Sequence, residues 1–271
     1  MGCLEYVSSD GAVVNLDSSR LCVGDGLELR GRSWKYDLGY RSVSGIAQEP
    51  TVVKADMACT SPGLADGMRR AFDRDARARK SGRLKSKGWE RDAYCLKTEP
   101  KSWNAASGHL TAELTFVLIG TWRKYLEESF LPTAPVLAHG YTHGYPHTYG
   151  YAGAMRSLDT GHDSPCRPKI TAYGPVSSPR IQIGDNVYAV DADVPEGAYL
   201  VIDGMSLTVE THMPDGTVRD DYAHALRGDG EGRGEYVFET IKPGVQPVSW
   251  AGTYGVEVGW WVEETEVPWS G

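Results

Sequence analysis

Three histidines spaced four residues apart are the first feature that could bind a metal ion. His139, His143 and His147 would share one face of a helix, an arrangement that zinc ligands use. Two glycines and a proline lie between them, and these residues break helices. The segment therefore favours a packed loop rich in tyrosine and histidine over a zinc site, and we expect no metal ion and no cofactor.

Paired carboxylates are the second feature, since glycoside hydrolysis uses two acids. The pairs here, Asp220-Asp221 and Glu263-Glu264, are direct neighbours, and adjacent residues of a strand point to opposite faces. Solvated acids are the favoured interpretation. No serine lies in a G-x-S-x-G elbow. We therefore predict no catalytic residue and expect that the chain is not an enzyme.

The segment 228–234 alternates glycine with charged residues, but it is acidic and lacks the Lys and Ser/Thr of a phosphate loop. Its oxygen spacing matches no EF-hand, so a hairpin loop is the favoured interpretation. The five cysteines contain no C-x-x-C pair, which indicates reduced thiols in a protein made in the cytosol. Because no stretch resembles a secretion signal or a transmembrane span, we expect no membrane partner.

The elements that would position these residues are mainly strands. In 34–38, Trp34, Tyr36 and Leu38 alternate with polar residues, which predicts a strand with one buried face. Ser61 and Pro62 suit a helix cap and the first helical position. Apolar residues then recur at steps of four up to Ser81-Gly82, which predicts an amphipathic helix whose apolar stripe is Leu64, Met68, Phe72 and Ala76.

The middle and the C-terminal third continue the β pattern. Apolar residues alternate from Leu110 to Leu118, and residues 120–124 are expected to end this strand with a short helix to Glu128. Residues 131–179 hold seven of the fifteen prolines and predict an irregular connector. Short strands follow, with a hairpin turn at 213–217 and a buried face of Val256, Val258, Trp260 and Val262.

These elements predict a fold that is mainly β with one α-helix (α+β), ending in two antiparallel sheets packed face to face. The predicted organisation is an N-terminal β domain over 1–131, a connector rich in proline, glycine and tyrosine over 132–166, and a C-terminal β-sandwich over 167–271.

Aromatic and charged residues indicate surfaces for other proteins. Eight tryptophans and fifteen tyrosines exceed what two small β domains need for their cores, and these residue types dominate interfaces. Residues 69–91 carry ten Arg/Lys against three Asp/Glu, whereas residues 182–271 carry four against seventeen. Two solvated faces, or complementary patches on neighbouring subunits, would explain this distribution. The candidate interface residues are Arg74, Arg77, Arg79, Trp89, Trp103, Tyr145, Tyr149, Trp261 and Trp269.

The order of these features resembles the distal tail protein (Dit) family of long-tailed phages. The matching segments are individually weak but extend along nearly the whole chain. They are the strand at 34–38, the helix after Asp56, the turn region 82–89, the strand from Leu114 to Arg123, the tyrosine-proline segment 145–151, and the C-terminal segments 197–203, 241–244 and 266–269. The histidines of the tyrosine-proline segment and the basic run at the helix depart from the family pattern.

The resemblance implies a ring-forming belt domain followed by a galectin-like β-sandwich. It further implies a homo-oligomeric ring of six copies at the virion tail tip, assembled in the host cytoplasm. Its partners would be the tail tube protein, the tip or hub protein and receptor-binding proteins, with DNA passing through the ring as transient cargo. Because Lys and Arg side chains lining the channel would bind DNA phosphates tightly, we expect the basic segment to lie away from the channel.

Three other functions fit parts of the same pattern. A β-sandwich with exposed tryptophans suits a carbohydrate-binding module of a tail or cell-wall protein. Separated carboxylates in a cleft would indicate a cell-wall hydrolase, and small β domains also occur in tube or hub subunits. A sandwich alone does not distinguish among these functions, because one fold hosts many of them.

Overall fold

The computed structural model describes residues 4–24, 28–133, 154–228 and 234–268, which divide into two compact units. The first unit is Met1–Lys124 with Glu263–Gly271, and the second is Tyr125–Val262. The division falls within two strands, β10 (His109–Phe130) and β21 (Val256–Glu264), so the chain returns to the first unit at its end. The predicted domain boundaries, after residue 131 and before residue 167, differ from the boundaries of these units. The roles predicted for the N-terminal domain, the connector and the C-terminal domain stay predictions.

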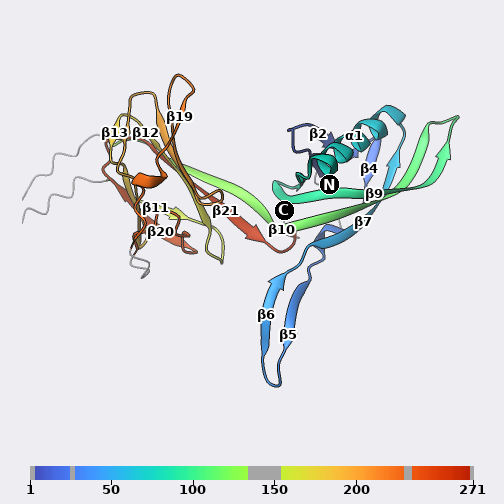
Figure 1. Ribbon diagram of the computed structural model, residues 1–271, viewed down its shortest axis with the longest axis horizontal. Helices are drawn as coiled ribbons and strands as arrows, with labels where there is room; N and C mark the ends of the chain where they lie inside the picture. Colours follow the sequence, from blue (N-terminus) through green and yellow to red (C-terminus); the bar gives the residue numbers. More distant parts are fainter. Residues whose placement is uncertain (1–3, 25–27, 134–153, 229–233, 269–271) are drawn as a thin grey trace, which may run out of the picture. The chain divides into compact units, whose positions relative to one another are not determined.

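The first unit is built on an antiparallel sheet in the order β10-β9-β8-β1-β2, with β7 on the other side of β10 and β4 beyond it (Figure 1). β10 is central here, because the same residues from Leu110 to Leu118 pair with both β7 and β9. The elements are β1 (Leu4–Val7), β2 (Val13–Asn15), β3 (Asp17–Ser18), β4 (Leu21–Val23), the 3-10 turn η1 (Glu28–Arg30), β5 (Trp34–Leu38), β6 (Val43–Gln48), β7 (Thr51–Cys59), α1 (Pro62–Ala78), β8 (Gly82–Ser86) and β9 (Trp89–Asn104).

The predicted helix is α1, which packs against β9 and β7. Pro62 begins it after Ser61, as predicted. It ends where Arg79 adopts a left-handed conformation and donates its backbone N–H to the carbonyl of Ala76. The predicted stripe is partly wrong: Met68 and Phe72 are buried, but Leu64 and Ala76 are exposed, and Ala71 and Asp75 are buried instead. A helix has 3.6 residues per turn, so the residues on one face recur at alternating steps of three and four. The buried face therefore differs from a stripe drawn at steps of four only.

The core of the first unit lies between α1 and the sheet. Phe72 contacts Tyr6 and Phe116 edge to face, with ring centroids 4.9 and 5.8 Å apart. Leu114, Leu118 and Trp122 are buried beside them on β10. The alternation of β10 from Leu110 to Leu118 is therefore confirmed as the pattern of a strand with one face in the core.

The helix expected after Gly120 is wrong, because β10 continues as a strand to Phe130. Gly120 has a φ of +66°, and the pairing with β9 shifts register between Ile119 and Arg123. A glycine with positive φ inside a strand is typical of a β-bulge, which bends a strand without ending it. The glycine therefore marks an irregularity within one continuous strand.

Among the described residues, the second unit contains two larger antiparallel sheets and the two-stranded sheet β13-β16. One larger sheet has the order β19-β18-β17-β12-β21, and the other has the order β11-β20-β14-β15. The elements are β11 (Ala154–Asp159), β12 (Arg167–Tyr173), β13 (Val176–Ser177), β14 (Arg180–Ile183), β15 (Asn186–Ala189), β16 (Asp193–Val194), β17 (Tyr199–Asp203), β18 (Thr208–His212), β19 (Val218–Asp220), the 3-10 turn η2 (Tyr222–His224) and β20 (Val245–Trp250). β11 lies inside the predicted connector and pairs with β20 along its whole length.

The buried faces of the two sheets form the core of the second unit. The predicted buried set of β21 is confirmed: Val256, Val258, Trp260 and Val262 are all at most 5% exposed. Contacts between the layers include the Phe130 and Trp250 rings, 5.6 Å apart, and a hydrogen bond from Trp260 Nε1 to the Thr160 carbonyl. The hairpin turn at 213–217 is also confirmed, with Gly216 at a φ of +85°.

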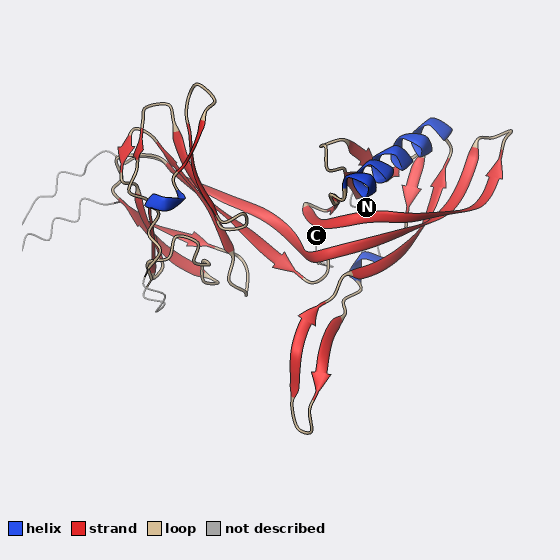
Figure 2. Cartoon of the chain, in the orientation of Figure 1, coloured by secondary structure: helices blue, strands red, loops and turns tan. Residues whose placement is uncertain are grey.

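The fold class predicted from the sequence is confirmed. The described chain is mainly β-strand, every strand pairing in it is antiparallel, and α1 is its one α-helix (Figure 2).

Candidate assembly surfaces

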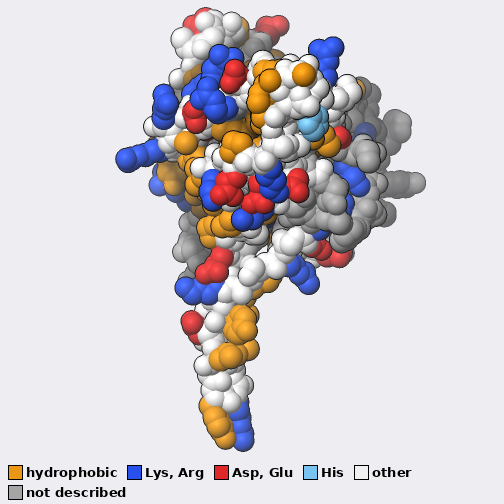
Figure 3. Space-filling model, turned by 90° about the vertical axis from the view of Figure 1, so that its right-hand side faces the viewer, with side chains coloured by type: hydrophobic (Ala, Val, Ile, Leu, Met, Phe, Trp, Pro, Cys, Tyr) orange, Lys and Arg blue, Asp and Glu red, His pale blue; other side chains and the backbone are white. Residues whose placement is uncertain are grey.

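A projecting hairpin, β5 with β6, is the main candidate surface of the first unit; we call it the arm. Among the described residues, its two strands pair only with each other, as a separate two-stranded sheet. Leu38 lies opposite Val43, and Trp34 lies opposite Gln48, so that apolar side chains share one face. Figure 3 shows apolar side chains along this projection. The residues of this apolar face are Trp34, Tyr36, Leu38, Val43 and Ile46.

The prediction of a strand at 34–38 is confirmed, but the prediction that one of its faces is buried is wrong. The five apolar side chains are between 44% and 75% exposed. The alternation predicts which side chains share a face, but it does not predict what covers that face. In the described part of the chain nothing does, and a contiguous apolar face of this kind typically marks a protein interface.

A bulge keeps the apolar residues of the arm on one side. The register shifts between Lys35 and Asp37, where β6 carries one more residue than β5. Gly45 lies within this shift with a φ of +61°, and a Cβ there would lie 2.3 Å from Asp37 Oδ2. Without the extra residue, the side chains of β6 beyond it would change face. The turn residue Tyr40 is the most exposed aromatic of the arm, at 94%.

The predicted basic surface lies partly on α1. Arg74, Arg77 and Arg79 are all exposed. Arg74 forms an ion pair with Asp10, and Arg69 contacts Asp73 at 3.0 Å. The outer side of the helix therefore carries a set of exposed arginines, some of them already paired within the unit.

Other cations of the basic segment lie in a different environment, on β8 and β9. Arg83 and Lys85 contact Glu90 at 3.1 and 3.5 Å, and Arg123 contacts the same carboxylate at 3.2 Å. These cations hold the pKa of Glu90 below its ordinary value, although burial alone would raise it. Arg91 is buried, and its guanidinium donates to Thr51 Oγ1. The net charge of 69–91 therefore does not form one continuous patch.

The predicted aromatic interface residues lie in different environments. Trp103, at the end of β9, is 54% exposed, whereas Trp89 is half-buried against the core of the first unit. Trp261 is half-buried in the second unit, 5.0 Å from the Tyr125 ring. Tyr145, Tyr149 and Trp269 lie outside the described residues, as do His139, His143 and His147. The interface role of these residues stays a prediction.

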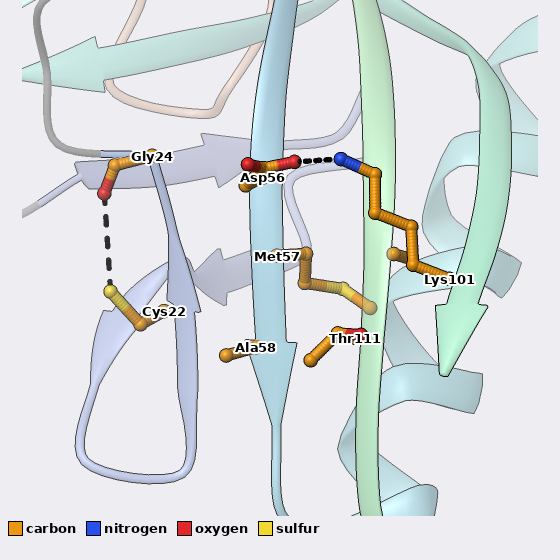
Figure 4. Close-up of a pocket in the computed structure, with 8 residues that line it drawn as sticks. Cys22, Gly24, Asp56, Met57, Ala58, Lys101 and Thr111 are labelled. Atoms are coloured by element: carbon orange, nitrogen blue, oxygen red, sulfur yellow. Dashed lines mark hydrogen bonds and ion pairs between the residues drawn. The ribbon is translucent and has the colours of Figure 1, made fainter. Parts of the chain in front are cut away.

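A depression of the first unit has a volume of about 410 Å³ and lies on the outer face of β7 and β10. In Figure 4 the Lys101 ammonium spans this depression to Asp56, 2.5 Å away. The Cys22 thiol points to the Gly24 carbonyl, not to a base. Lys101 also contacts Glu113 at 3.4 Å. These contacts pair charges across strands and do not assemble an activated nucleophile.

The prediction that the paired acids are solvated is wrong for Asp221, and Glu263 and Glu264 are both half-buried. Asp221 is buried, where it accepts hydrogen bonds from Thr211 Oγ1 and Arg219 Nε, whereas Asp220 is exposed. Among the described residues, no group of three or more His, Cys, Asp and Glu side chains has the arrangement of a metal site. None of the described helices is long and apolar enough to cross a membrane.

A hollow on the outer face of the second unit is a feature that sequence reasoning missed. Its volume is about 720 Å³, and outward-facing residues of β12, β17 and β18 line it together with Tyr125 and Glu257. The outward positions of these strands carry tyrosine, histidine and acids in alternation with the buried residues. That alternation is visible in the sequence, but it does not say which strands are neighbours.

Comparisons with known proteins place the fold. No protein-family model and no curated protein sequence matches the chain. A chain of the phage P2 baseplate, in its activated conformation with calcium, matches with a TM-score of 0.63 and 11% identity, covering 98% of this chain and 99% of that one. The same baseplate with strontium gives a TM-score of 0.63 at 11% identity, covering 98% and 100%.

A third solved structure matches at a similar level. It is the Dit protein of phage SPP1, described as a paradigm of the hub adsorption apparatus in phages that infect Gram-positive hosts. It matches with a TM-score of 0.56 and 10% identity, covering 97% of this chain and 99% of that one. The likeness therefore extends over both units, and the chain has a Dit-like fold, shared with proteins of phage baseplates.

Proposed function

We propose that this chain is a structural subunit of a phage tail tip and that its copies associate into a ring. The fold supports a place in the virion, because it matches baseplate and hub proteins over nearly the full length of each chain. The observation that carries self-association is the arm, whose apolar face has no cover in the described part of the subunit. A neighbouring copy would bury that face.

The contacts of such a ring are heterologous: one patch of a subunit meets a different patch of the next. An arm that projects from one subunit suits this geometry, because it reaches a surface other than itself. Six copies are expected from the resemblance to the Dit family. In this role the ring joins the tail tube to the tip or hub proteins and to receptor-binding proteins, and DNA passes through it. It would assemble in the host cytoplasm and catalyse no reaction.

The arm provides the test of self-association. We expect the double substitution Leu38→Asp with Ile46→Asp to leave each subunit folded but to prevent ring formation, because two charges would have to be buried at the interface. Light scattering after gel filtration gives the mass of the assembly, and negative-stain images show its shape. The thermal melting midpoint reports whether the subunit remains folded.

Lys35→Glu is a matched control, because it changes the net charge by the same two units on the other face of the arm. We expect it to leave the assembly intact. Rings of unchanged mass from the double variant would contradict the role of the arm. A wild-type chain that stays monomeric, alone and when mixed with tail tube protein, would contradict ring formation itself.

A further inference from the structure

The hollow of the second unit combines an aromatic row with polar rows on one sheet face. Tyr173, Tyr199 and His212 lie directly opposite one another on β12, β17 and β18. The rings of Tyr173 and Tyr199 are 6.2 Å apart, and Tyr199 stacks on the His212 ring at 4.8 Å with an interplanar angle of 7°. Three rings therefore form a continuous row across three strands.

Carboxylates occupy the row beside the aromatic one. Thr171 lies opposite both Glu257 on β21 and Val201 on β17, and Val201 lies opposite Glu210 on β18. Glu257 accepts a hydrogen bond from the Tyr173 hydroxyl at 3.3 Å, which joins the two rows. The polar atoms of this row are mainly hydrogen-bond acceptors.

The next row adds a hydrogen-bond donor and a further aromatic ring. Lys169 lies opposite Asp203 and Gly259, and its ammonium is 5.9 Å from the centre of the Tyr125 ring. The Tyr125 ring lies against the backbone at Gly259, where an added Cβ would be 2.1 Å from the tyrosine oxygen. Glycine is therefore required for Tyr125 to approach the strand this closely at this edge of the hollow.

We infer that this hollow binds a neutral saccharide. A saccharide presents hydroxyl donors around its edge and an apolar C–H face, and the hollow offers carboxylate acceptors beside an aromatic row. Its volume of about 720 Å³ lies within the roughly 300–1,000 Å³ of small-molecule sites.

The charge of the hollow selects among saccharides. Four acids, Glu127, Asp203, Glu210 and Glu257, face it together with one ammonium, that of Lys169. This balance disfavours sulfated or phosphorylated glycans, because the acids would repel their charges. Lys169 lies opposite Asp203, and an ammonium can donate a hydrogen bond to a ligand oxygen, which favours an uncharged, oxygen-rich ligand over a basic peptide.

A glycan array probed with the full-length chain tests this inference. The array should hold neutral oligosaccharides, sulfated oligosaccharides and a lysine-rich peptide, and calorimetric titration with the best neutral oligosaccharide should follow. We expect binding to neutral members, and a loss of about tenfold or more in affinity for Tyr199→Ala, which removes the central ring of the row. Glu257→Gln keeps the shape of the side chain but removes an ionised acceptor, and it should weaken binding in the same direction.

Tyr222→Ala is the matched control. Tyr222 is 40% exposed on the same unit and lies outside the hollow, whereas Tyr199 is 38% exposed within it. We expect the control to bind as the wild type does. The inference is overturned if the wild type binds no neutral glycan, if the lysine-rich peptide is preferred, or if both hollow variants bind as tightly as the wild type.

This site does not depend on the proposed ring. Variants of the hollow should assemble normally, and variants of the arm should retain glycan binding. Failure of one proposal is therefore distinguishable from failure of the other.

Discussion

At the scale of single residues, Asp75 connects α1 to the start of the chain. The carboxylate is buried and accepts hydrogen bonds from the Tyr6 hydroxyl at 2.7 Å, the Ser9 hydroxyl at 2.6 Å and the Ser9 backbone N–H at 2.9 Å. A buried acid is tolerated when its oxygens are satisfied in this way. The apolar periodicity of the helix does not predict an acid at a buried position.

The Tyr6 hydroxyl provides a test of this connection. We expect Tyr6→Phe to lower the free energy of unfolding of the first unit by about 1.5–3 kcal/mol, the range for a hydrogen bond to a charged group. The ring remains, so that its contact with Phe72 is kept. Urea titration followed by circular dichroism measures the loss. Tyr36→Phe removes an exposed hydroxyl on the arm and should change nothing; an equal loss there would show that the Asp75 bond is not the cause.

At the scale of elements, two glycines give opposite expectations. Gly67 lies inside α1, where an added Cβ would meet nothing within 4 Å, whereas Gly259 of β21 faces the Tyr125 ring. Glycine in a helix interior costs conformational entropy that alanine does not. In contrast, a methyl group at Gly259 would displace a packed ring.

We therefore expect Gly67→Ala to raise the free energy of unfolding by about 0.5–1 kcal/mol. Gly259→Ala should lower it by about 1–3 kcal/mol, the cost of overpacking. Thermal and urea unfolding of both variants provide the measurement. A Gly259→Ala chain as stable as the wild type would contradict the close approach of Tyr125.

At the scale of the whole molecule, the cations of the basic segment 69–91 are distributed over several different local environments. Arg83 and Lys85 of β8 pair with Glu90, and Arg91 of β9 is buried, whereas the arginines of α1 remain on the outer surface. The exposed helix arginines therefore retain the steering role that the sequence suggested.

Arg70 and Arg77 are the best positions to test this role, because Arg74 pairs with Asp10 and Arg79 has a φ of 53°. We expect Arg70→Glu with Arg77→Glu to weaken ring assembly and to flatten or reverse its dependence on salt, with little change in the stability of the subunit. Light scattering across a salt series measures this. Assembly with an unchanged salt dependence would show that the helix faces no acidic partner.

The sequence alone determined much of the local structure, because backbone preferences and side-chain periodicity act over a few residues. Ser61 and Pro62 located the start of α1, the alternation in Val256–Val262 gave the buried face of β21, and residues 213–217 gave a turn. The fold class followed from such elements, since strands with one apolar face must pack in layers.

Tertiary structure alone decided which faces meet and which remain open. The alternation at Trp34, Tyr36 and Leu38 could not show that the strand would pair only with β6 and leave its apolar face exposed. The sequence also could not show that Tyr173, Tyr199 and His212 lie in one row, because cross-strand register joins residues far apart in the chain. Local sequence fixes the direction of a side chain within its element, whereas its neighbours depend on long-range pairing and burial of the whole chain.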